Sequence, residues 1–295
     1  MLRSMYSGIG GMKNFQTKLD VIGNNIANVN TYGFKKGRVV FQDLYSQSIS
    51  GASAPGGTKG GTNPRQVGLG SQLATIDTIQ NGGSLQTTGR TLDLAISGDG
   101  FFQVAQSDAS HASFNNTAYT RAGNFYMDKD GYLVNSEGLY LVGYANPTGS
   151  TTPLTYTHTG GNLSGVSGST KSPIKIPTDA KSMSIGQDGS VSYVDNTGTL
   201  KYAGVIELAK FPNAGGLEKA GANLFKDTSN SGTPILDVAG LSGNGSIQSG
   251  SLEMSNVDLS EEFTEMIVAQ RGFQANTKII TTSDEILQEL VNLKR

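Results

Sequence analysis

The stretch DLSEEFTEMIVAQRGFQANTKIITTSDEILQELVNL, residues 258–293, decides the fold of this chain. It contains no proline and its apolar residues recur every seven positions, so it predicts one long helix over 259–293. Asp258 is the expected N-cap, with Glu261 three residues later as in a capping box. One column of the repeat is apolar and the neighbouring column is mixed. The apolar column is Leu259, Met266, Phe273, Ile280 and Leu287, and the mixed column begins with Phe263.

A second helix, also free of proline, is expected at the other end of the chain. Tyr32-Gly33 followed by two lysines predicts where it stops, with Gly33 as a glycine C-cap. Asparagines crowd its last turns beside the apolar columns, which indicates hydrogen bonds to a partner or, alternatively, a frayed end facing water. Its apolar residues form two columns spaced by seven: Met5, Met12, Leu19 and Ile26 in one, and Phe15, Ile22 and Val29 in the other.

The two ends of the chain carry opposite charges. The first 45 residues hold six basic and two acidic side chains, and the last 45 hold four basic and eight acidic ones, although the whole chain has a net charge of only −2. Each helix alone would leave an apolar stripe in water. We therefore expect the helices to pack together, within one subunit or between neighbours, with charge setting the pairing preference.

The centre of the chain has a different character. All eight prolines lie between Pro55 and Pro234, and short alternating strands flank Asp-Gly turns at 130–131 and 188–189. The predicted fold class is therefore mixed α and β: terminal helices form a coiled-coil-like inner domain, and the centre is an antiparallel all-β domain. The expected parts are a helical terminal domain (1–45 and 251–295), a linker or extended arm (46–75), and a β domain (76–250) with a loop-rich insertion near 146–172.

Several kinds of chemistry find no support in the sequence. The chain has no cysteine, no charge excess for nucleic acid, and no apolar stretch long enough to insert in a membrane. His111 and His158 stand in polar stretches without a second ligand at metal spacing, so both are expected at the surface. Asp128-x-Asp130-Gly131 lacks the acid of a calcium loop, because its twelfth position is Leu139; a hairpin turn is expected there. We expect no enzyme activity, no metal and no cofactor.

Three segments resemble the bacterial flagellar rod and hook proteins. LDVIGNNIANVNTYGFK (19–35) is similar to the N-terminal signature of that family, residues 254–276 to its C-terminal helix, and residues 120–134 to its shared β domain. The signature positions that this chain carries are Asn24, Asn25, Asn28, Asn30, Gly33, Phe34, Gln270, Arg271 and Asn276.

The resemblance implies a structural subunit of a helical tube outside the cell, exported without a cleaved signal peptide. Residues 268–276 and 290–293 look more like the hook, a flexible joint that passes torque from rod to filament, whereas 206–225 is similar to the distal rod protein. The hook is favoured and the distal rod protein is the alternative. Implied partners are further copies of the chain, the distal rod protein, the hook cap, the hook–filament junction proteins and the flagellar export apparatus.

The residues expected to form the polymerisation seam are the apolar ones of both helices. A different class of protein stays open from the residues alone: a secreted adhesin or binding module on a coiled-coil stalk. The seam residues are Met5, Met12, Leu19, Ile22, Ile26, Leu259, Phe263, Met266, Phe273, Ile280 and Leu287.

Overall fold

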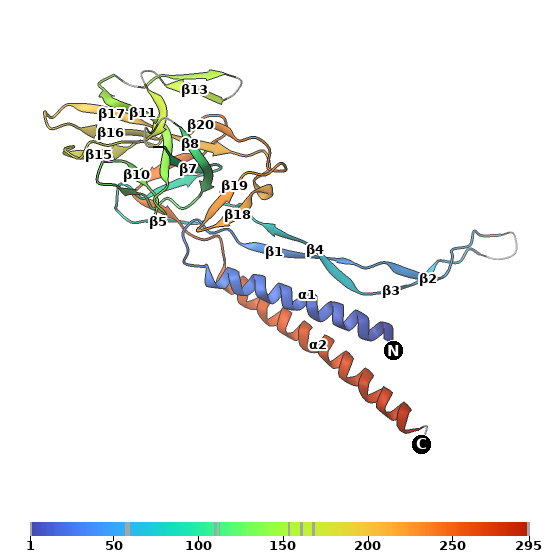
Figure 1. The fold of residues 1–295 in the computed structure, drawn as a ribbon. Coiled ribbons are helices and arrows are strands. Elements are labelled where there is room, and N and C mark those ends of the chain that lie inside the picture. The colour runs from blue at the N-terminus through green and yellow to red at the C-terminus, as the bar shows by residue number, and fades with distance from the viewer. Residues whose placement is uncertain are drawn as a thin grey trace. The chain divides into compact units, whose positions relative to one another are not determined.

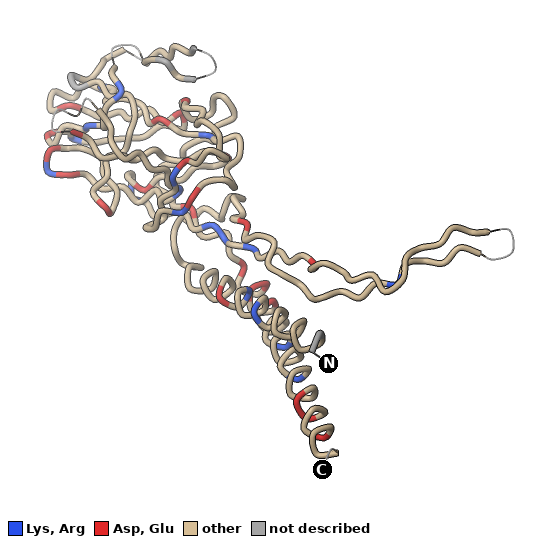
Figure 2. Tube along the Cα trace, turned by 45° about the vertical axis from the view of Figure 1, so that its right-hand side comes forward, with Lys and Arg blue, Asp and Glu red and all other residues tan. Residues whose placement is uncertain are grey.

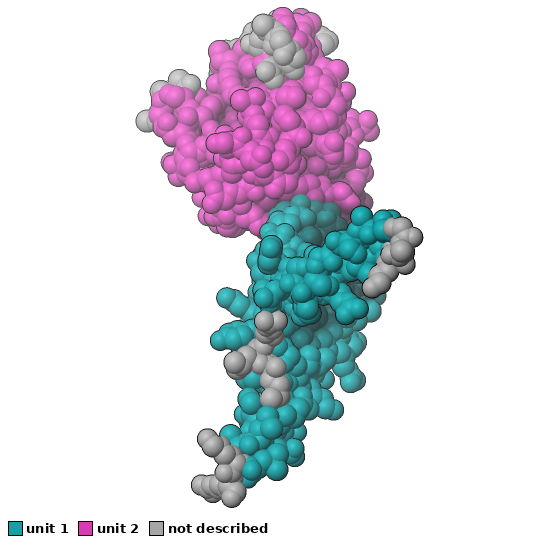
Figure 3. Space-filling model, turned by 90° about the vertical axis from the view of Figure 1, so that its right-hand side faces the viewer, with its two compact units in different colours: residues 1–28, 36–79, 257–295 teal, residues 29–35, 80–256 magenta. Residues whose placement is uncertain are grey.

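A computed structural model describes residues 2–56, 60–108, 111, 113–152, 154–159, 162–166 and 169–293. The chain forms two compact units, coloured separately in Figure 3. Unit 1 comprises residues 1–28, 36–79 and 257–295, and unit 2 comprises residues 29–35 and 80–256. Helical termini and an antiparallel β centre confirm the predicted fold class.

Unit 1 is built on two long helices, α1 (Leu2–Ala27) and α2 (Leu259–Asn292), which lie side by side and antiparallel (Figure 1). Asp258 caps α2 as predicted, since its side chain accepts hydrogen bonds from the backbone N–H groups of Ser260 and Glu261. The predicted end of the first helix at Gly33 is wrong. α1 ends at Ala27, where the asparagine-rich segment forms turns and the Asn28 side chain bonds to the carbonyl oxygen of Asn24.

A long β arm completes unit 1. Strand β1 (Gly37–Asp43) pairs with β4 (Ser71–Thr78), and β2 (Ser46–Ser50) pairs with β3 (Arg65–Gly68), all antiparallel. The segment 46–75, expected as a linker or extended arm, thus contains paired strands, and part of the expected helical segment 1–45 is strand β1. Its Gly, Ser and Thr content concealed the strands, which are almost wholly exposed and carry few charged side chains (Figure 2).

Unit 2 is the β domain. Its main sheet has 12 strands, with the central order β15-β16-β17-β11-β7-β8-β19-β18, and the pairs β6–β21 and β5–β22 lie outside it. Strand β22 belongs to this unit although residues 251–253 were expected with the terminal helix. The strands of unit 2 are as follows: β5 Leu85–Thr87, β6 Leu94–Ser97, β7 Phe101–Ser107, β8 Phe114–Thr120, β9 Tyr126–Met127, β10 Leu133–Val134, β11 Tyr140–Ser150, β12 Tyr156–Thr159, β13 Asn162–Val166, β14 Thr170–Pro173, β15 Ser182–Ile185, β16 Ser190–Val194, β17 Leu200–Lys210, β18 Glu218–Gly221, β19 Leu224–Lys226, β20 Ile235–Val238, β21 Ser246–Ser249 and β22 Ser251–Glu253.

Apolar side chains from alternate strand positions fill the interior of unit 2. The largest cluster includes Leu94, Phe102, Phe125 and Leu141, each fully buried. Gly131 has the positive φ that the Asp-Gly turn between β9 and β10 requires, so the predicted hairpin is confirmed.

The expected loop-rich insertion at 146–172 is more ordered than predicted over its described part. It contains the hairpin β12–β13, whose Leu163 and Val166 are buried in a small cluster with Tyr144. His158 of this hairpin is exposed as predicted, and its Nε2 lies 2.9 Å from Oδ1 of the buried Asp237. His111 stacks on the ring of Tyr132.

Candidate assembly site

The contact face of α2 consists of two columns of a seven-residue repeat. Met266, Phe273, Ile280 and Leu287, which are half-buried, form the predicted apolar column. The second column is not the predicted one that begins with Phe263. It lies one residue earlier and holds small or polar side chains: Glu262, Ala269, Asn276 and Ser283. We call these eight positions and the α1 residues that meet them the helix seam.

The α1 side of the helix seam is centred on small residues. A Cβ placed on Gly11 would lie 2.8 Å from Oδ1 of Asn276, and one placed on Gly8 would lie 3.5 Å from the side chain of Ile280. On α2, a Cβ placed on Gly272 would lie 2.5 Å from the Phe15 ring. Glycines at these points let the two backbones approach closely, which offsets their cost of about 1 kcal/mol in a helix interior.

Apart from the four apolar α2 residues of the helix seam, the predicted seam residues fall into three groups. Ile22 is buried in the helix seam, together with Gly8, Gly11, Phe15 and Asn25 of α1. Leu259 and Phe263 at the start of α2 are 40% and 50% exposed. The remaining four on α1 lie beside the helix seam and are half-buried: Met5, Met12, Leu19 and Ile26.

The hydrogen bonds of Asn25 explain why this signature position holds an asparagine. Its side-chain amide bonds to Gly37 twice, with Nδ2 donating to the carbonyl oxygen at 2.9 Å and the Gly37 N–H donating to Oδ1 at 3.0 Å. The same Nδ2 donates to Oε2 of Glu262 at 3.2 Å. One buried amide therefore joins the end of α1, the start of β1 and the first turn of α2.

The Glu262 carboxyl group is buried beside charged neighbours. Burial raises its pKa, and the hydrogen bond from Asn25 and the positive charge of Lys36 oppose that rise. Lys36 pairs with Glu261 and Lys18 with Glu265, each at 2.7 Å. These side chains line a cavity of about 240 Å³ between α1, β1 and α2.

The other signature residues have simpler surroundings. Asn24 on α1 is exposed, as is Asn30, which lies beyond the end of α1 in unit 2, and Asn28 bonds to Asn24 just after the helix end. Gln270 and Arg271 are exposed on α2. The remaining one, Asn276, donates from Nδ2 to the carbonyl oxygen of Gly272 and packs against Gly11.

The last two signature residues belong to unit 2. Gly33 has φ +69°, and a Cβ there would lie 2.6 Å from the backbone nitrogen of Ala122, so glycine is required. Its N–H donates to the carbonyl oxygen of Glu253 at 2.8 Å. Phe34 is buried under the Lys219 ammonium, 5.0 Å from the ring centroid.

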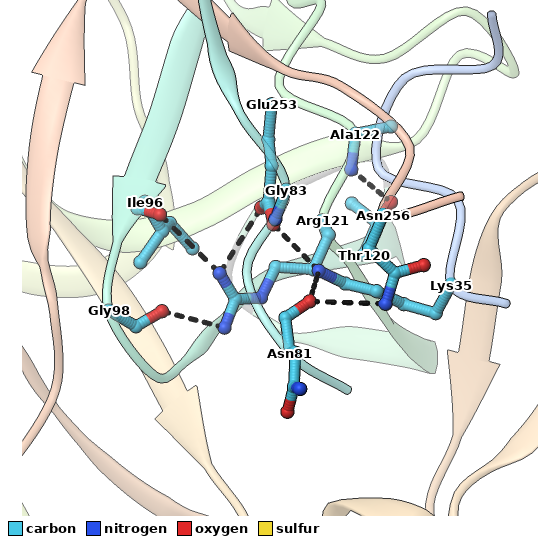
Figure 4. Close-up of polar contacts among 10 residues, drawn as sticks. All are labelled: Lys35, Asn81, Gly83, Ile96, Gly98, Thr120, Arg121, Ala122, Glu253 and Asn256. Atoms are coloured by element: carbon cyan, nitrogen blue, oxygen red, sulfur yellow. Dashed lines mark hydrogen bonds and ion pairs between the residues drawn. The ribbon is translucent and has the colours of Figure 1, made fainter. Parts of the chain in front are cut away.

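A buried ionic cluster forms around Lys35, the residue directly after Phe34, and it was not predicted from the sequence (Figure 4). The Glu253 carboxylate accepts from Lys35 Nζ at 2.6 Å and from Arg121 Nη1 at 3.2 Å, and all three side chains are at most 3% exposed. Lys35 also donates to the carbonyl oxygen of Asn81 at 2.8 Å, and Gly83 N–H donates to Glu253. Burial lowers the pKa of Lys35, and the charge of Glu253 opposes this shift.

This cluster joins three stretches of unit 2, each of which lies next to a boundary of the unit in the sequence. Residues 29–35, 80–83 and 251–256 each contribute a group, and Arg121 joins them to the β sheet, donating from Nη2 to the carbonyl oxygen of Gly98 at 2.8 Å. A signal existed in the sequence, since Lys35 and Arg121 both lie inside the quoted family segments. Their common partner Glu253 lies 218 and 132 positions away, beyond any local pattern.

Exposed apolar side chains gather in unit 1. Most of the large apolar residues that are more than a third exposed lie on its helices and arm. Those on the helices and their ends are Tyr6, Ile9, Leu259, Phe263, Ile267, Val268, Ile279, Ile286, Leu290, Val291 and Leu293, and those on the arm are Tyr45, Ile49, Val67, Leu69, Leu73 and Ile76. Patches of this kind mark surfaces that bind other proteins.

The described residues offer no arrangement for catalysis on a metal, because no three acidic or histidine side chains among them converge as ligands. Neither helix, as far as it is described, is apolar enough over a sufficient length to cross a membrane. The geometry is that of a surface for association between proteins.

Comparison with known proteins places the chain in a family. Residues 5–35 match the flagella basal body rod protein family, residues 95–193 the flagellar hook protein FlgE/F/G D1 domain, and residues 248–293 the flagellar basal body rod FlgEFG protein C-terminal region. The flagellar basal-body rod protein FlgG of Bacillus subtilis is 57% identical over 296 residues, covering 100% of both chains.

Two further relatives come from Borreliella burgdorferi, and both are covered in full, as is this chain. Its flagellar basal-body rod protein FlgG is 36% identical over 300 residues. Its flagellar hook protein FlgE is 34% identical over an alignment of 448 residues. The chain belongs to the bacterial flagellar rod and hook protein family and is a structural subunit of the axial part of the flagellum.

Proposed function

We propose that this chain is the distal rod subunit, which polymerises into a rigid tube that transmits torque. The observation that carries the proposal is the match to the Bacillus subtilis rod protein FlgG, 57% identical from end to end. The two chains align over 296 residues, so rod protein and chain have the same parts in the same order.

The hook, which residues 268–276 and 290–293 favoured on sequence grounds, is the second candidate. The hook relative from Borreliella burgdorferi aligns over 448 residues, so it carries long segments that this chain lacks. The similarity of residues 206–225 to distal rod proteins also supports the rod. The hook-like features lie in the helices, which both kinds of protein share.

Assembly would proceed through unit 1. Its helices expose apolar side chains over their length, and burial of apolar surface contributes about 25 cal/mol per Å². The seam residues predicted from the sequence are proposed to take part in two ways, some in the contact between α1 and α2 and the others between copies. Unit 2, with its own closed core, would form the outer layer. Other rod proteins, the hook and the export apparatus are the proposed partners.

Deleting the gene and imaging the remaining basal bodies tests the proposal. Truncated rods without hooks are the expected result, because nothing could then extend the proximal rod. Complete rods that lack only the hook would overturn the proposal in favour of the hook subunit. Re-expressing the intact chain should restore full rods.

A second test uses the purified chain. Concentration or salting-out should give straight hollow tubes in electron micrographs. Bent or coiled tubes would favour the hook, and discrete dimers or trimers would contradict a role as an axial subunit. A chain that lacks residues 1–28 should form no tubes, since its α2 has lost its partner in the helix pair.

A further inference from the structure

Unit 2 contains a cavity of about 240 Å³, and all the residues that line it belong to that unit. Strand β7 begins and β17 ends at this cavity, and Arg121, directly after β8, lines it as well. The buried aromatic residues Phe101 and Phe211 form part of its wall. The exposed apolar residues of the candidate assembly site lie mostly in unit 1, so this cavity is a separate feature of the molecule.

The guanidinium group of Arg121 has one N–H group to spare. Nη1 donates to Glu253 at 3.2 Å and to the carbonyl oxygen of Ile96 at 3.4 Å, and Nη2 donates to that of Gly98 at 2.8 Å (Figure 4). Its Nε atom is buried and has no hydrogen-bond partner among the described residues. The guanidinium carbon lies 5.3 Å from the centroid of the Phe101 ring, which lines the same cavity. A buried N–H group without a partner is costly, so Nε is a free donor for a ligand.

Positive charge exceeds negative charge around this donor. Lys35 and Arg121 share the single carboxylate of Glu253, so the buried ionic cluster has two cations and one anion. A buried charge without a counter-charge is unfavourable. The surplus positive charge next to the cavity therefore favours an anion inside it.

A second cation, Lys210, also lines the cavity. Its Nζ donates to the carbonyl oxygen of Gly243 at 3.1 Å and lies 3.8 Å from Oδ2 of Asp99. An ammonium group has three N–H donors, so one remains for a ligand. Asp99 is the one acidic residue in the lining, and because its side chain is 76% exposed, water weakens its hold on Lys210.

We propose that this cavity binds a carboxylate group, which accepts hydrogen bonds from Nε of Arg121 and Nζ of Lys210. Water could bond to Nε, but only an anion would also balance the surplus positive charge. Two free donors match the two oxygens of a carboxylate. The rings of Phe101 and Phe211 make the surroundings less polar than water, which strengthens such charge-assisted hydrogen bonds.

Gln80 narrows the class of ligand. It lines the cavity, and its Nε2 donates to the carbonyl oxygen of Ala214 at 3.4 Å, while its Oε1 is buried without a hydrogen-bond partner among the described residues. A free acceptor beside two free donors fits a carboxylate whose neighbouring group carries an O–H or N–H. A small hydroxy acid has this chemistry, and so does an acidic side chain of another protein next to its own backbone N–H.

Titration calorimetry on the full-length, unpolymerised chain tests the site. Sodium glycolate is the probe, and sodium chloride keeps the ionic strength constant. We expect saturable binding of glycolate, weaker binding of acetate, which lacks the hydroxyl group, and no binding of the neutral analogue glycolamide. Equal heats for glycolate and glycolamide would overturn the proposal.

Two variants of opposite sign check which groups bind the carboxylate. Lys210→Met removes a donor and a charge and should weaken glycolate binding about tenfold. Asp99→Asn removes the competing carboxylate and should tighten binding, an effect that a loss of folding cannot produce. Lys226→Met, at an exposed position outside the cavity, is the control and should leave the affinity unchanged. The same affinity in all three variants would overturn the assignment.

Blocked peptides distinguish the two sources of the carboxylate. Tighter binding of Gly-Asp-Gly than of glycolate, with no binding of Gly-Asn-Gly, would assign the cavity to an acidic side chain of another protein. Tighter binding of glycolate would assign it to a free small acid. Binding of neither would overturn the proposal. None of these measurements requires tubes to form, so their failure leaves the proposed function as a distal rod subunit untouched.

Discussion

The two units of this chain distribute their apolar residues in opposite ways. Unit 2 places them inside, in three buried clusters under antiparallel strands. Unit 1 has Ile22 and Ala269 as its only fully buried apolar side chains among the described residues, and it leaves most of its large ones in contact with water. Burial of apolar surface is the main stabilising term in folding. Unit 2 therefore has a buried core of its own, whereas unit 1 leaves most of its large apolar side chains exposed.

The units also differ in how they use charge. In unit 2, the buried carboxylate of Glu253 forms ion pairs with the buried side chains of Lys35 and Arg121. In unit 1, the ion pairs of Lys18 and Lys36 with α2 are partly exposed and contribute at most about 1 kcal/mol each.

The largest effect is expected from Glu253→Gln. The substitution leaves Lys35 and Arg121 buried without their shared anion, and breaking a buried ion pair costs about 3–5 kcal/mol. Denaturant unfolding followed by tyrosine fluorescence should show a much lower midpoint for unit 2. Glu218→Gln, on an exposed strand, is the control and should leave that midpoint unchanged. Equal midpoints for both variants would contradict the structural role of the cluster.

Phe273→Asp should damage unit 1 alone. Phe273 is half-buried in the helix seam, so the loss is about 2 kcal/mol, roughly half the cost of removing a fully buried phenylalanine. The helical signal in circular dichroism should fall and tubes should be lost, while the unfolding midpoint of unit 2 stays constant. Normal tubes from this variant would refute the seam assignment.

Two glycine variants sharpen the description of the helix pair. Gly272→Ala forces a methyl group to within 2.5 Å of the Phe15 ring and should destabilise unit 1 by about 1–3 kcal/mol through overpacking. Gly23→Ala meets no neighbour and should stabilise α1 by about 0.5–1 kcal/mol. The thermal unfolding midpoint, followed by the helical signal in circular dichroism, should fall for Gly272→Ala and rise for Gly23→Ala. Parallel shifts would show that the helices do not pack as described.

The smallest effect concerns pH. The pKa of Glu262 is raised in the folded protein, so the folded state binds this proton more tightly than the unfolded chain does. The contribution of Glu262 to the free energy of unfolding is complete below its pKa in the unfolded chain. This contribution is lost as the pH rises through its higher pKa in the folded protein. Glu262→Gln should remove this dependence and make the helix pair less sensitive to pH between 4 and 8. Glu289→Gln, exposed on the same helix and outside the cavity, is the control for the loss of one charge.

Much of the fold could be predicted from the sequence because its signals are local. The seven-residue columns gave the helices, Asp258 gave the start of α2, and Asp-Gly turns gave the hairpins. Glycines were misinterpreted, since Gly8 and Gly11 weaken an isolated helix but permit close contact in a pair. The strands at 46–75 were missed because they are polar and exposed, with no alternation to reveal them.

The site was predicted less completely than the fold. Four of the five residues in the predicted apolar column of α2 lie in the helix seam, whereas Leu259 is 40% exposed. The companion column was placed one residue too late, because Phe263 is a large apolar residue and Ala269 and Ser283 are small. Asn25 could be recognised as a signature residue, yet its partner Glu262 lies 237 positions away. Contacts between segments far apart in the sequence produce no repeating pattern of residues from which they could be predicted.

The order of elements along the chain has a consequence for biogenesis. The 26 residues of α1 are made first, and their partner α2 emerges only after the whole of unit 2 has been synthesised. Until that moment α1 can pack only against the arm, and it has no second helix to pair with. A prematurely terminated product can thus fold its β half yet never gain a competent polymerising half. Incorporation into the growing structure is in this way reserved for products whose synthesis has passed α2.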